Sequence, residues 1–426
     1  MIKLRSGRFL PHGLLKPLTV TLALTCLACG LGGRSGADAS PTPGEFRQTS
    51  LAAVSTTLPT DSQIVAKMRL VGDYFIANGA VQVQAWPTEA LEAMSTKNTD
   101  WHSAVLLHGI TLLKDATGDT KYDLPRKNWA DRGKWRPFGN TGDGTITTHP
   151  DHLAAGLTYY DLKATVYPTA DLSYFDSQMA ANMRDPVNRF TWVDTAWMMM
   201  PTYVAWYTKT GNTGYLTRAF DEYHNLKERG LWNSTTKLWY RDTRFAGANA
   251  IRLSNGKELV WSRGNGWMFA ALARVLPKIP TTGADHAEYL STFRAMAAKL
   301  ITLQNANDGF WRANLADGSS TAICPIKTSP STFSGENGCA NPETSGTALF
   351  VYGLARGINN GYLSSTTYKP YVAKAWNGML TAVSTKGVLG YCQGVGDRPS
   401  AAASNESYDF CVGAFLMAGR QVQLMP

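Results

Sequence analysis

The sequence predicts one all-α domain built as a ring of helical hairpins. Three observations support this: apolar residues recur with helical spacing from about residue 60 onward, strand-like alternation is scarce, and similar glycine-containing joins separate successive helices. Recurring hairpins form either an open solenoid or a closed ring. We favour the ring, because the chain has neither the steady period nor the polar capping repeats of a solenoid.

Polar residues and prolines mark where several of the predicted helices begin. Asp100 precedes an apolar helical run, Pro150 suits a first helical turn, and Ser262 is a common type of N-cap. The predicted helices span residues 61–78, 100–117, 151–166, 189–209, 213–228, 262–276, 283–305, 344–359, 365–384 and 404–420.

The joins between helices repeat a pattern. Residues 117–122 and 210–215 each end a long helix at a glycine and open the next with an aromatic residue, and residues 356–362 are a looser copy. If the inner helices of a ring run in the same direction, their N-termini meet on one face. The clusters at 149–152, 192–194, 261–267 and 343–346 would then share a pocket whose helix dipoles suit a bound carboxylate.

The N-terminal region has the features of an export signal. Basic residues precede the apolar run 18–29, which matches a signal peptide in length and is too short to span a bilayer. Residues 27–30 resemble a lipoprotein cleavage site, and cleavage near 37–39 is the soluble alternative. We therefore expect a signal peptide at 1–40, a flexible linker at 41–59 and a single domain at 60–426. The mature protein would be secreted, periplasmic or lipid-anchored at the cell surface.

Composition narrows the class of partner. The chain has 426 residues, of which 44% are hydrophobic and 17% charged, enough to bury a large core. Removing residues 1–40 leaves 36 basic and 31 acidic residues, a net charge of +5. That balance fits an anionic ligand, but no basic cluster of the kind that follows a nucleic-acid backbone is present. We expect no nucleic-acid partner, and the oligomeric state stays open.

Four cysteines follow the signal segment: Cys324, Cys339, Cys392 and Cys411. An even number in an exported chain predicts two disulfides. Three connectivities are open, and we favour Cys324–Cys339 with Cys392–Cys411 because these pairs close small loops. None of these four cysteines shows C-x-x-C spacing, so a zinc or redox role is not expected.

The stretch 261–267, W-S-R-G-N-G-W, has the chemistry to bind an acidic sugar. The indoles of Trp261 and Trp267 can stack on pyranose rings, the guanidinium of Arg263 can pair with a carboxylate, and the glycines allow close backbone approach. The alternative is a Ser262 helix cap with both tryptophans packed in the core.

Two aspartates are candidate acid–base groups. Asp194 lies at the start of a helix, where an acidic residue commonly only complements the helix dipole. Acting as a general acid would require a raised pKa, to which desolvation by Trp192 and Trp197 and a second carboxylate, Asp151, could contribute. His149 and His152 flank Asp151, but this spacing alone is weak evidence for a metal, and we expect no metal and no cofactor. Trp101 could stack on a sugar or pack in the core.

Taken in order, these motifs resemble the unsaturated rhamnogalacturonyl hydrolases of glycoside hydrolase family 105 and the related unsaturated glucuronyl hydrolases of family 88. The resemblance rests on residues 100–101, 149–157, 191–194, 261–267 and 343–346, and covers roughly residues 60–426. It implies an (α/α)6 barrel, a six-hairpin toroid. It also implies a small unsaturated uronic-acid oligosaccharide as substrate.

The resemblance also implies a reaction and residue roles. Such enzymes hydrate the C4=C5 double bond of a terminal unsaturated uronic acid instead of attacking C1 with two carboxylates. Asp194 would protonate C4 and then deprotonate the water added at C5, and Asp151 would tune Asp194 and bind hydroxyls. The candidate substrate-binding residues are Trp101, His152, Trp192, Arg241, Trp261, Arg263 and Trp267. Arg241 stands near where family members often place a histidine, so its role is open.

Three interpretations of the function follow. The first is release of unsaturated galacturonyl residues from rhamnogalacturonan-derived oligosaccharides. The second is the same chemistry on unsaturated glucuronyl fragments of ulvan, glycosaminoglycans or gellan-like polymers. The third is a uronate-binding protein without catalytic activity, which would not require a titrating group at Asp194.

Overall fold

The computed structural model describes residues 54–78, 100–137, 149–187, 190–328 and 333–426. Contacts divide the chain into residues 1–39 and 40–426, and all described residues belong to the second unit. The predicted signal peptide at 1–40 and most of the predicted linker lie outside the described residues. Residues 54–60, at the end of that linker, form no helix or strand and lead directly into the first helix.

Helices make up most of the described chain, and the strands there form two short antiparallel hairpins, β1–β2 and β3–β4. The helices are α1 (Asp61–Asn78), α2 (Trp101–Thr117), α3 (Asp123–Arg132), α4 (Pro150–Leu153), α5 (Ala155–Thr165), α6 (Ser173–Asn182), α7 (Thr195–Thr210), α8 (Gly214–Glu228), α9 (Ser262–Val275), α10 (Ala284–Ile301), α11 (Thr344–Asn359), α12 (Ser365–Thr381) and α13 (Asp409–Gln423). The strands are β1 (Trp232–Asn233), β2 (Leu238–Trp239), β3 (Ile323–Lys327) and β4 (Phe333–Gly338). None of the described helices has the length and apolar character needed to cross a bilayer.

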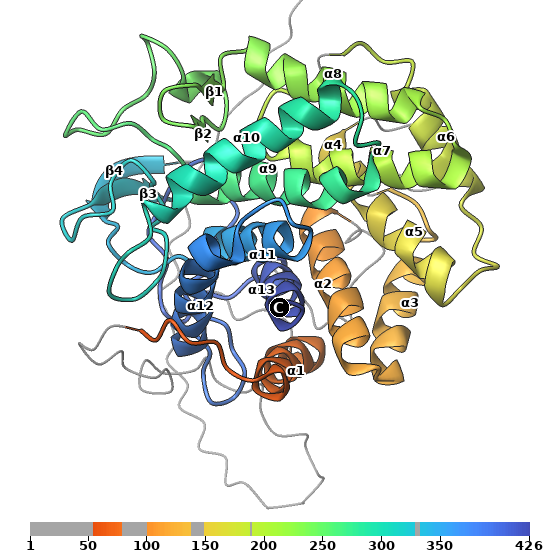
Figure 1. Cartoon of the computed structure of the whole chain (residues 1–426), viewed down its shortest axis with the longest axis horizontal. Coiled ribbons are helices and arrows are strands. Elements are labelled where there is room, and N and C mark those ends of the chain that lie inside the picture. Colours follow the sequence, from red (N-terminus) through yellow and green to blue (C-terminus); the bar gives the residue numbers. More distant parts are fainter. Residues whose placement is uncertain (1–53, 79–99, 138–148, 188–189, 329–332) are drawn as a thin grey trace, which may run out of the picture. The chain divides into compact units, whose positions relative to one another are not determined.

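Alternate helices form an inner ring. Helix α2 packs on α5, the α4–α5 segment packs on α7, and the contacts continue from α7 through α9 and α11 to α13, which packs back on α2. Figure 1 shows α11 and α13 side by side, with α12 and α1 outside them. The remaining helices alternate with the inner ones along the chain, so the domain is an (α/α)6 barrel, as the sequence predicts.

Burial separates the inner helices from ordinary amphipathic ones. Every residue of α9 except Arg274 is buried, and α11 is buried through all but its last turn. A helix whose side chains are apolar or small on all sides belongs in the interior of a large domain. Helix α11 has a local cap: the side chain of Glu343 accepts hydrogen bonds from the backbone N–H groups of Ser345 and Gly346 at its start. Helix α9 begins after Trp261 without a side-chain capping hydrogen bond.

The ring closes through a close approach of α2 and α13. A Cβ atom added at Gly109 would lie 2.6 Å from the carbonyl oxygen of Gly413, and one added at Gly413 would lie 2.4 Å from the carbonyl oxygen of Val105. Only glycine allows two helix backbones to come this near, so the first and last inner helices meet backbone to backbone.

Several elements differ from the prediction. Helices α3 and α6 were not predicted, because each is short and buries only a few large apolar residues, such as Trp129 in α3 and Phe175 in α6. The predicted helix 151–166 is split into α4 and α5 at Ala154. Helix α7 starts at Thr195 and α13 at Asp409, later than predicted, because extended or turn-forming residues lead into both.

Candidate active site

The N-termini of the inner helices meet on one face of the barrel, where acidic residues gather. Asp100 precedes α2, Asp151 lies in α4, Asp194 precedes α7, and Asp409 is the first residue of α13. These four residues are called the carboxylate cluster below. Asp151 interacts electrostatically with both Asp100 and Asp194, and Asp409 interacts with Asp100 through space. The predicted convergence of helix N-termini therefore produces a concentrated group of carboxylates.

Of the two predicted catalytic residues, Asp194 and Asp151, Asp194 is the more deeply buried. The residue is 8% exposed, and its side chain makes no capping hydrogen bond to α7. Its Oδ2 atom lies 3.3 Å from Nε of Arg241. Burial raises the pKa of Asp194, while the charges of Arg241 and Arg263 lower it, with a net increase. Burial thus favours the protonated form of this carboxyl group, and the adjacent guanidinium opposes it.

Arg241 is fixed by the segment that follows the β1–β2 hairpin. Its backbone carbonyl accepts a 2.8 Å hydrogen bond from the N–H of Val193, next to Asp194. Its Nη1 atom donates a 3.0 Å hydrogen bond to Asp242, and its Cζ atom lies 5.5 Å from the centre of the Trp192 ring. The side chain retains 20% exposure, so Arg241 is a positioned cation that solvent can still reach.

Asp151 is placed by the single turn of α4, where Pro150 occupies the first helical position. Burial, followed by the charges of Asp100 and Asp194, raises the pKa of Asp151 to about 7 against the opposing charges of Arg241 and His102. Its side chain is 26% exposed. A carboxyl group that is accessible and partly protonated at neutral pH suits proton transfer or sharing with a neighbour.

Three residues of this face were not predicted as functional: Asp100, His102 and Asp409. His102 Nδ1 lies 2.5 Å from Asp409 Oδ2, and its Nε2 lies 3.9 Å from Asp100 Oδ2. Burial lowers the pKa of His102, but the charge and hydrogen bond of Asp409 and the charge of Asp100 outweigh it and raise the pKa to about 9. The sequence shows Asp100 and His102 beside Trp101. It does not show that His102 contacts Asp409, which is 307 residues away along the chain.

The rim of this face carries aromatic and imidazole rings. The His149 ring centre lies 5.5 Å from that of Trp192 and 4.8 Å from that of His152. Burial, with a contribution from His149, lowers the pKa of His152 to about 4, so its imidazole is neutral at pH 7. Trp101 is partly buried against Phe410, with ring centres 5.1 Å apart. Trp101, Trp192 and His152 are therefore partly exposed rings next to the carboxylate cluster.

Trp261 and Trp267 occupy the interior. Each is 1% exposed. Trp261 donates a 2.9 Å hydrogen bond from Nε1 to the side chain of Gln393, and Trp267 packs between Trp101 and Trp197, with ring centres about 6 Å away. The expectation that these indoles stack on the substrate is wrong for this structure, because neither ring has a free face. The alternative, tryptophans packed in the core, describes them.

Arg263 is also turned inward. It is 1% exposed, and its guanidinium donates to the carbonyl oxygens of Gln393 at 2.5 Å and Gly394 at 2.8 Å and to Ser345 Oγ at 3.1 Å. A guanidinium held in this way is not available to grip a substrate carboxylate. Its role here is to anchor the loop at 393–394 to α9 and to place a positive charge beneath Asp194. Arg241 is the arginine next to Asp194 that retains exposed surface.

The described residues contain both short-range disulfides favoured from the sequence. Cys324–Cys339 joins β3 to the residue after β4, and Cys392–Cys411 joins the loop before α13 to α13 itself. Within the described part of the chain, no group of three or more His, Cys, Asp or Glu side chains is arranged to hold a metal ion.

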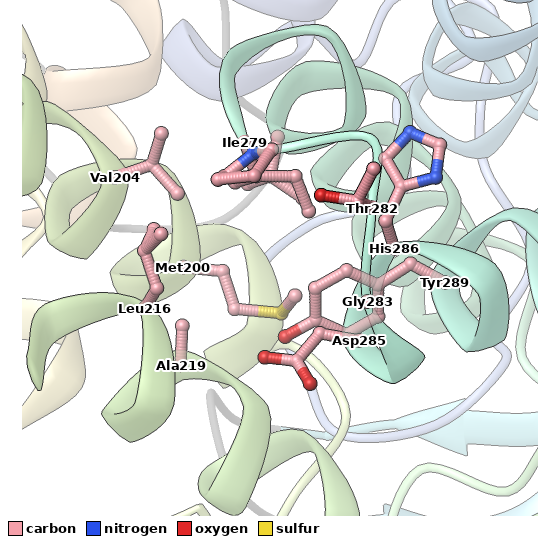
Figure 2. Close-up of a pocket in the computed structure, with 12 residues that line it drawn as sticks. Met200, Val204, Leu216, Ala219, Ile279, Thr282, Gly283, Asp285, His286 and Tyr289 are labelled. Carbon is pink, nitrogen blue, oxygen red and sulfur yellow. The ribbon is translucent and has the colours of Figure 1, made fainter. Parts of the chain in front are cut away.

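A cavity lies away from the carboxylate cluster. Its volume is about 240 Å³, and Figure 2 shows its side chains, with Met200, Val204, Leu216 and Ala219 from α7 and α8 facing Asp285, His286 and Tyr289 from α10. Val204 is ten residues beyond Asp194 on the same helix, which corresponds to about 15 Å along the axis. This mostly apolar cavity is therefore separate from the acid–base groups.

Comparisons with known proteins agree with this fold and indicate a family. The sequence profile described as Glycosyl Hydrolase Family 88 matches residues 78–425. Two curated proteins named Unsaturated 3S-rhamnoglycuronyl hydrolase are similar to the chain. The one from Formosa agariphila is 27% identical over 353 residues, covering 78% of this chain and 87% of that protein. The one from Alteromonas sp. is 27% identical over 364 residues, covering 78% and 80% respectively.

Solved structures show the same architecture. A glycosyl hydrolase family 88 protein from Bacteroides vulgatus superposes with a TM-score of 0.72 and 28% identity, covering 86% of this chain and all of that one. An unsaturated glucuronyl hydrolase from Bacillus sp. GL1 shares the fold, with a TM-score of 0.57 at 14% identity, covering 84% and 96% of the two chains. Because the family profile spans most of the sequence, the chain belongs to glycosyl hydrolase family 88 and is a glycoside hydrolase.

Proposed function

We propose that this enzyme removes a 4,5-unsaturated uronyl residue from the non-reducing end of an oligosaccharide by hydrating its C4=C5 double bond. The observation that carries the proposal is the placement of Asp194, which is buried, makes no capping bond to its helix and lies between Arg241 and a second titratable carboxyl group. Asp194 is the general acid and then the general base of the reaction.

Proton transfer from Asp194 to C4 converts the enol ether to a cation centred on C5 and the ring oxygen. Water then adds at C5 and gives its proton to the Asp194 carboxylate, which restores the acid. The resulting hemiketal opens to a ketone, and the sugar attached at C1 is released. Burial favours the protonated acid and Arg241 favours the carboxylate, so one residue can serve both steps.

The neighbouring residues take supporting roles in this proposal. Asp151 interacts with Asp194 through space and, with a pKa of about 7, binds substrate hydroxyl groups as donor or acceptor. The exposed part of Arg241 is a partner for the uronate carboxylate. Trp101, Trp192 and His152 supply partly exposed rings for contact with the sugars.

The names of the relatives bear on the sugar. Both curated relatives are named for rhamnoglycuronyl substrates, a term that covers any uronyl residue linked to rhamnose. The family assignment favours the glucuronyl form over the galacturonyl alternative, because the resemblance to family 88 is a resemblance to unsaturated glucuronyl hydrolases. We therefore expect higher kcat/KM on an unsaturated glucuronyl–rhamnose disaccharide than on the galacturonyl counterpart. A higher kcat/KM on the galacturonyl disaccharide would favour the galacturonyl substrate instead.

The decisive experiment follows the unsaturated-uronate absorbance in D₂O. The wild-type enzyme should remove the absorbance and place deuterium at C4, and Asp194→Asn should lower kcat by at least about 10³-fold while retaining affinity by calorimetry. Unchanged absorbance on glucuronyl, galacturonyl and glycosaminoglycan fragments, with binding intact, would favour a uronate-binding protein instead.

Export is part of the same proposal. Two disulfides form and persist in an oxidising compartment, which is consistent with a secreted, periplasmic or lipid-anchored enzyme. Such a location would place the enzyme where polysaccharide fragments arise outside the cytoplasm.

A further inference from the structure

A buried imidazole–carboxylate pair lies directly behind the proposed acid–base residues. His102, in the first turn of α2, contacts Asp409, the first residue of α13, with 2.5 Å between Nδ1 and Oδ2. Asp409 is 2% exposed and the His102 side chain 17%. The other ring nitrogen of His102 is directed to Asp100, at 3.9 Å from Oδ2. The imidazole is therefore held between two carboxylates contributed by two adjacent inner helices.

The charges around this pair connect it to the acid–base residues. His102 interacts through space with Asp409 on α13, with Asp100 before its own helix and with Asp151 on α4. Asp100 in turn acts on Asp151 and opposes its ionisation. His102 is thus the cation on this side of the carboxylate cluster.

The other charges that act on the acid–base pair come from the opposite side. Arg241 acts on both Asp151 and Asp194, and Arg263 and Asp242 act on Asp194. His149 Nδ1 lies 4.0 Å from Asp151 Oδ2, but burial lowers the pKa of His149, so this ring is neutral at pH 7. A change of charge at His102 would therefore act on Asp151, and the described residues around Asp151 supply no second imidazolium to compensate for it.

Stability alone does not account for such a pair. A buried ion pair gains Coulomb energy but loses hydration, and apolar residues of similar volume often stabilise a protein equally well. Without a cation here, Asp100, Asp151 and Asp194 would compete for protons as three interacting carboxylates.

We propose that His102, held in its charged form by Asp409, is a positioning residue that favours the ionised form of Asp100 and thereby directs the exchangeable proton to Asp151 and Asp194. The inference rests on the proposed function, since it assigns the proton used in hydration. Removing the imidazole removes a positive charge and makes every nearby carboxyl group harder to ionise. Removing Asp409 leaves burial to lower the pKa of His102, so the ring loses its proton, and the loss of this nearer positive charge outweighs the loss of the Asp409 charge.

The test is the pH dependence of kcat/KM in three variants. His102→Gln should move both limbs of the profile to higher pH by roughly one unit, and Asp409→Asn should move them in the same direction by a smaller amount, because it removes a negative charge together with the imidazolium charge. The double variant His102→Gln/Asp409→Asn lacks the same two charges, so its limbs should coincide with those of Asp409→Asn. A merely structural role predicts reduced activity in all three variants with unmoved limbs, which would overturn the proposal.

A matched control is available on the outside of the barrel. His224 and Glu288 form an imidazole–carboxylate pair of similar geometry, 2.7 Å apart, between α8 and α10. His224→Gln removes the same kind of pair outside the carboxylate cluster and should leave the limbs of the profile unmoved. If His102→Gln does not fold, Asp409→Asn decides alone: a shift to higher pH supports the proposal, and an unmoved or lowered profile overturns it.

A second readout separates this inference from the proposed reaction. Carboxyl ¹³C NMR of aspartate-labelled protein reports the titration of Asp151 and Asp194 without turnover. Upward titration shifts in both variants, larger in His102→Gln, in an enzyme inactive on every unsaturated uronide, would uphold the charge arrangement and refute the reaction. Turnover of an unsaturated uronide with unchanged carboxyl titrations would do the reverse.

Discussion

Asp151 and Asp194 are subject to the same forces in different proportions. Asp194 is buried beside Arg241, so the penalty of desolvating its charge is offset by an adjacent cation. Asp151 is more exposed but faces two other carboxylates, and its pKa is raised to about 7. Both residues are therefore expected to destabilise the folded state when ionised, as is common where function requires a poised carboxyl group.

This difference predicts a pH-dependent gain in stability for Asp151→Asn. The folded-state pKa of about 7 lies above the ordinary value of 3.8, so the unfolded chain loses this proton first and wild-type stability falls as pH rises from about 4 to 7. Asparagine removes that loss. At pH 8 we expect the variant to be more stable than wild type by roughly 1–2 kcal/mol, discounted for the partial exposure of the side chain.

Urea unfolding at pH 5 and pH 8 measures the effect, and the stability gain of Asp151→Asn should be larger at pH 8. Asp119 is the control with the opposite sign, because its hydrogen bond with Arg69 lowers its pKa. Asp119→Asn should lose stability at both pH values. A gain for Asp151→Asn that is equal at pH 5 and pH 8 would contradict a proton-linked origin.

At the residue scale, the sequence predicted which residues gather on this face better than it predicted the contacts between them. Asp151 and Asp194 were recognisable because helix starts and neighbouring motifs marked them. The burial of Trp261 and Arg263 was not, because it depends on Gln393 and Gly394, about 130 residues away in a loop without periodicity. The partnership of His102 with Asp409 escaped detection for the same reason: it is created by ring closure.

At the element scale, apolar periodicity located the long inner helices and missed the short or irregular pieces. Helices α2 and α11 begin and end within a residue of their predicted limits because strong caps flank long apolar runs. The β1–β2 hairpin has two residues in each strand, too few for alternation to be recognised, although it leads into Arg241. Thus the site depends on an element that carries almost no pattern of its own.

The two disulfides belong to elements with different relations to the site, which gives a second prediction. Cys392–Cys411 joins the segment next to Gln393 and Gly394 to α13, the helix that begins with Asp409. Cys324–Cys339 closes the β3–β4 hairpin. Their sequence separations are 19 and 15 residues, so each should contribute about 3 kcal/mol by restricting the unfolded chain.

We therefore expect Cys392→Ala/Cys411→Ala and Cys324→Ala/Cys339→Ala to lower Tm to a similar extent and activity to different extents. At a temperature where both variants are folded, loss of Cys392–Cys411 should reduce kcat/KM by about tenfold or more, because it loosens the support of Arg263 and Asp409. The other variant should stay within about threefold of wild type. Equal losses of activity would show that the two disulfides act only through global stability.

At the scale of the whole molecule, the functional face exists only because the ring is closed. Asp100 and His102 belong to the first helix of the inner ring and Asp409 to the last, and they meet because α2 packs on α13. The sequence predicted a ring from its repeated joins, but it gave no sign of which surfaces seal it. The sequence pattern does not distinguish Gly109 and Gly413 from other helical residues, and their role becomes clear only from the contact between the two backbones.

This seal predicts that Gly413→Ala damages stability and activity together. The new methyl group would lie 2.4 Å from the carbonyl oxygen of Val105, and a helix backbone cannot retreat as a flexible side chain can. Helix α13 must therefore shift away from α2, which separates Asp409 from His102. We expect a loss of about 2–3 kcal/mol in urea unfolding, together with a displaced pH profile. Gly318→Ala is the matched control, because its added Cβ meets no atom within 4 Å. Equal unfolding midpoints for the two variants would show that α13 can move away from α2 without loss of stability. The close contact at Gly413 would then not be required for ring closure.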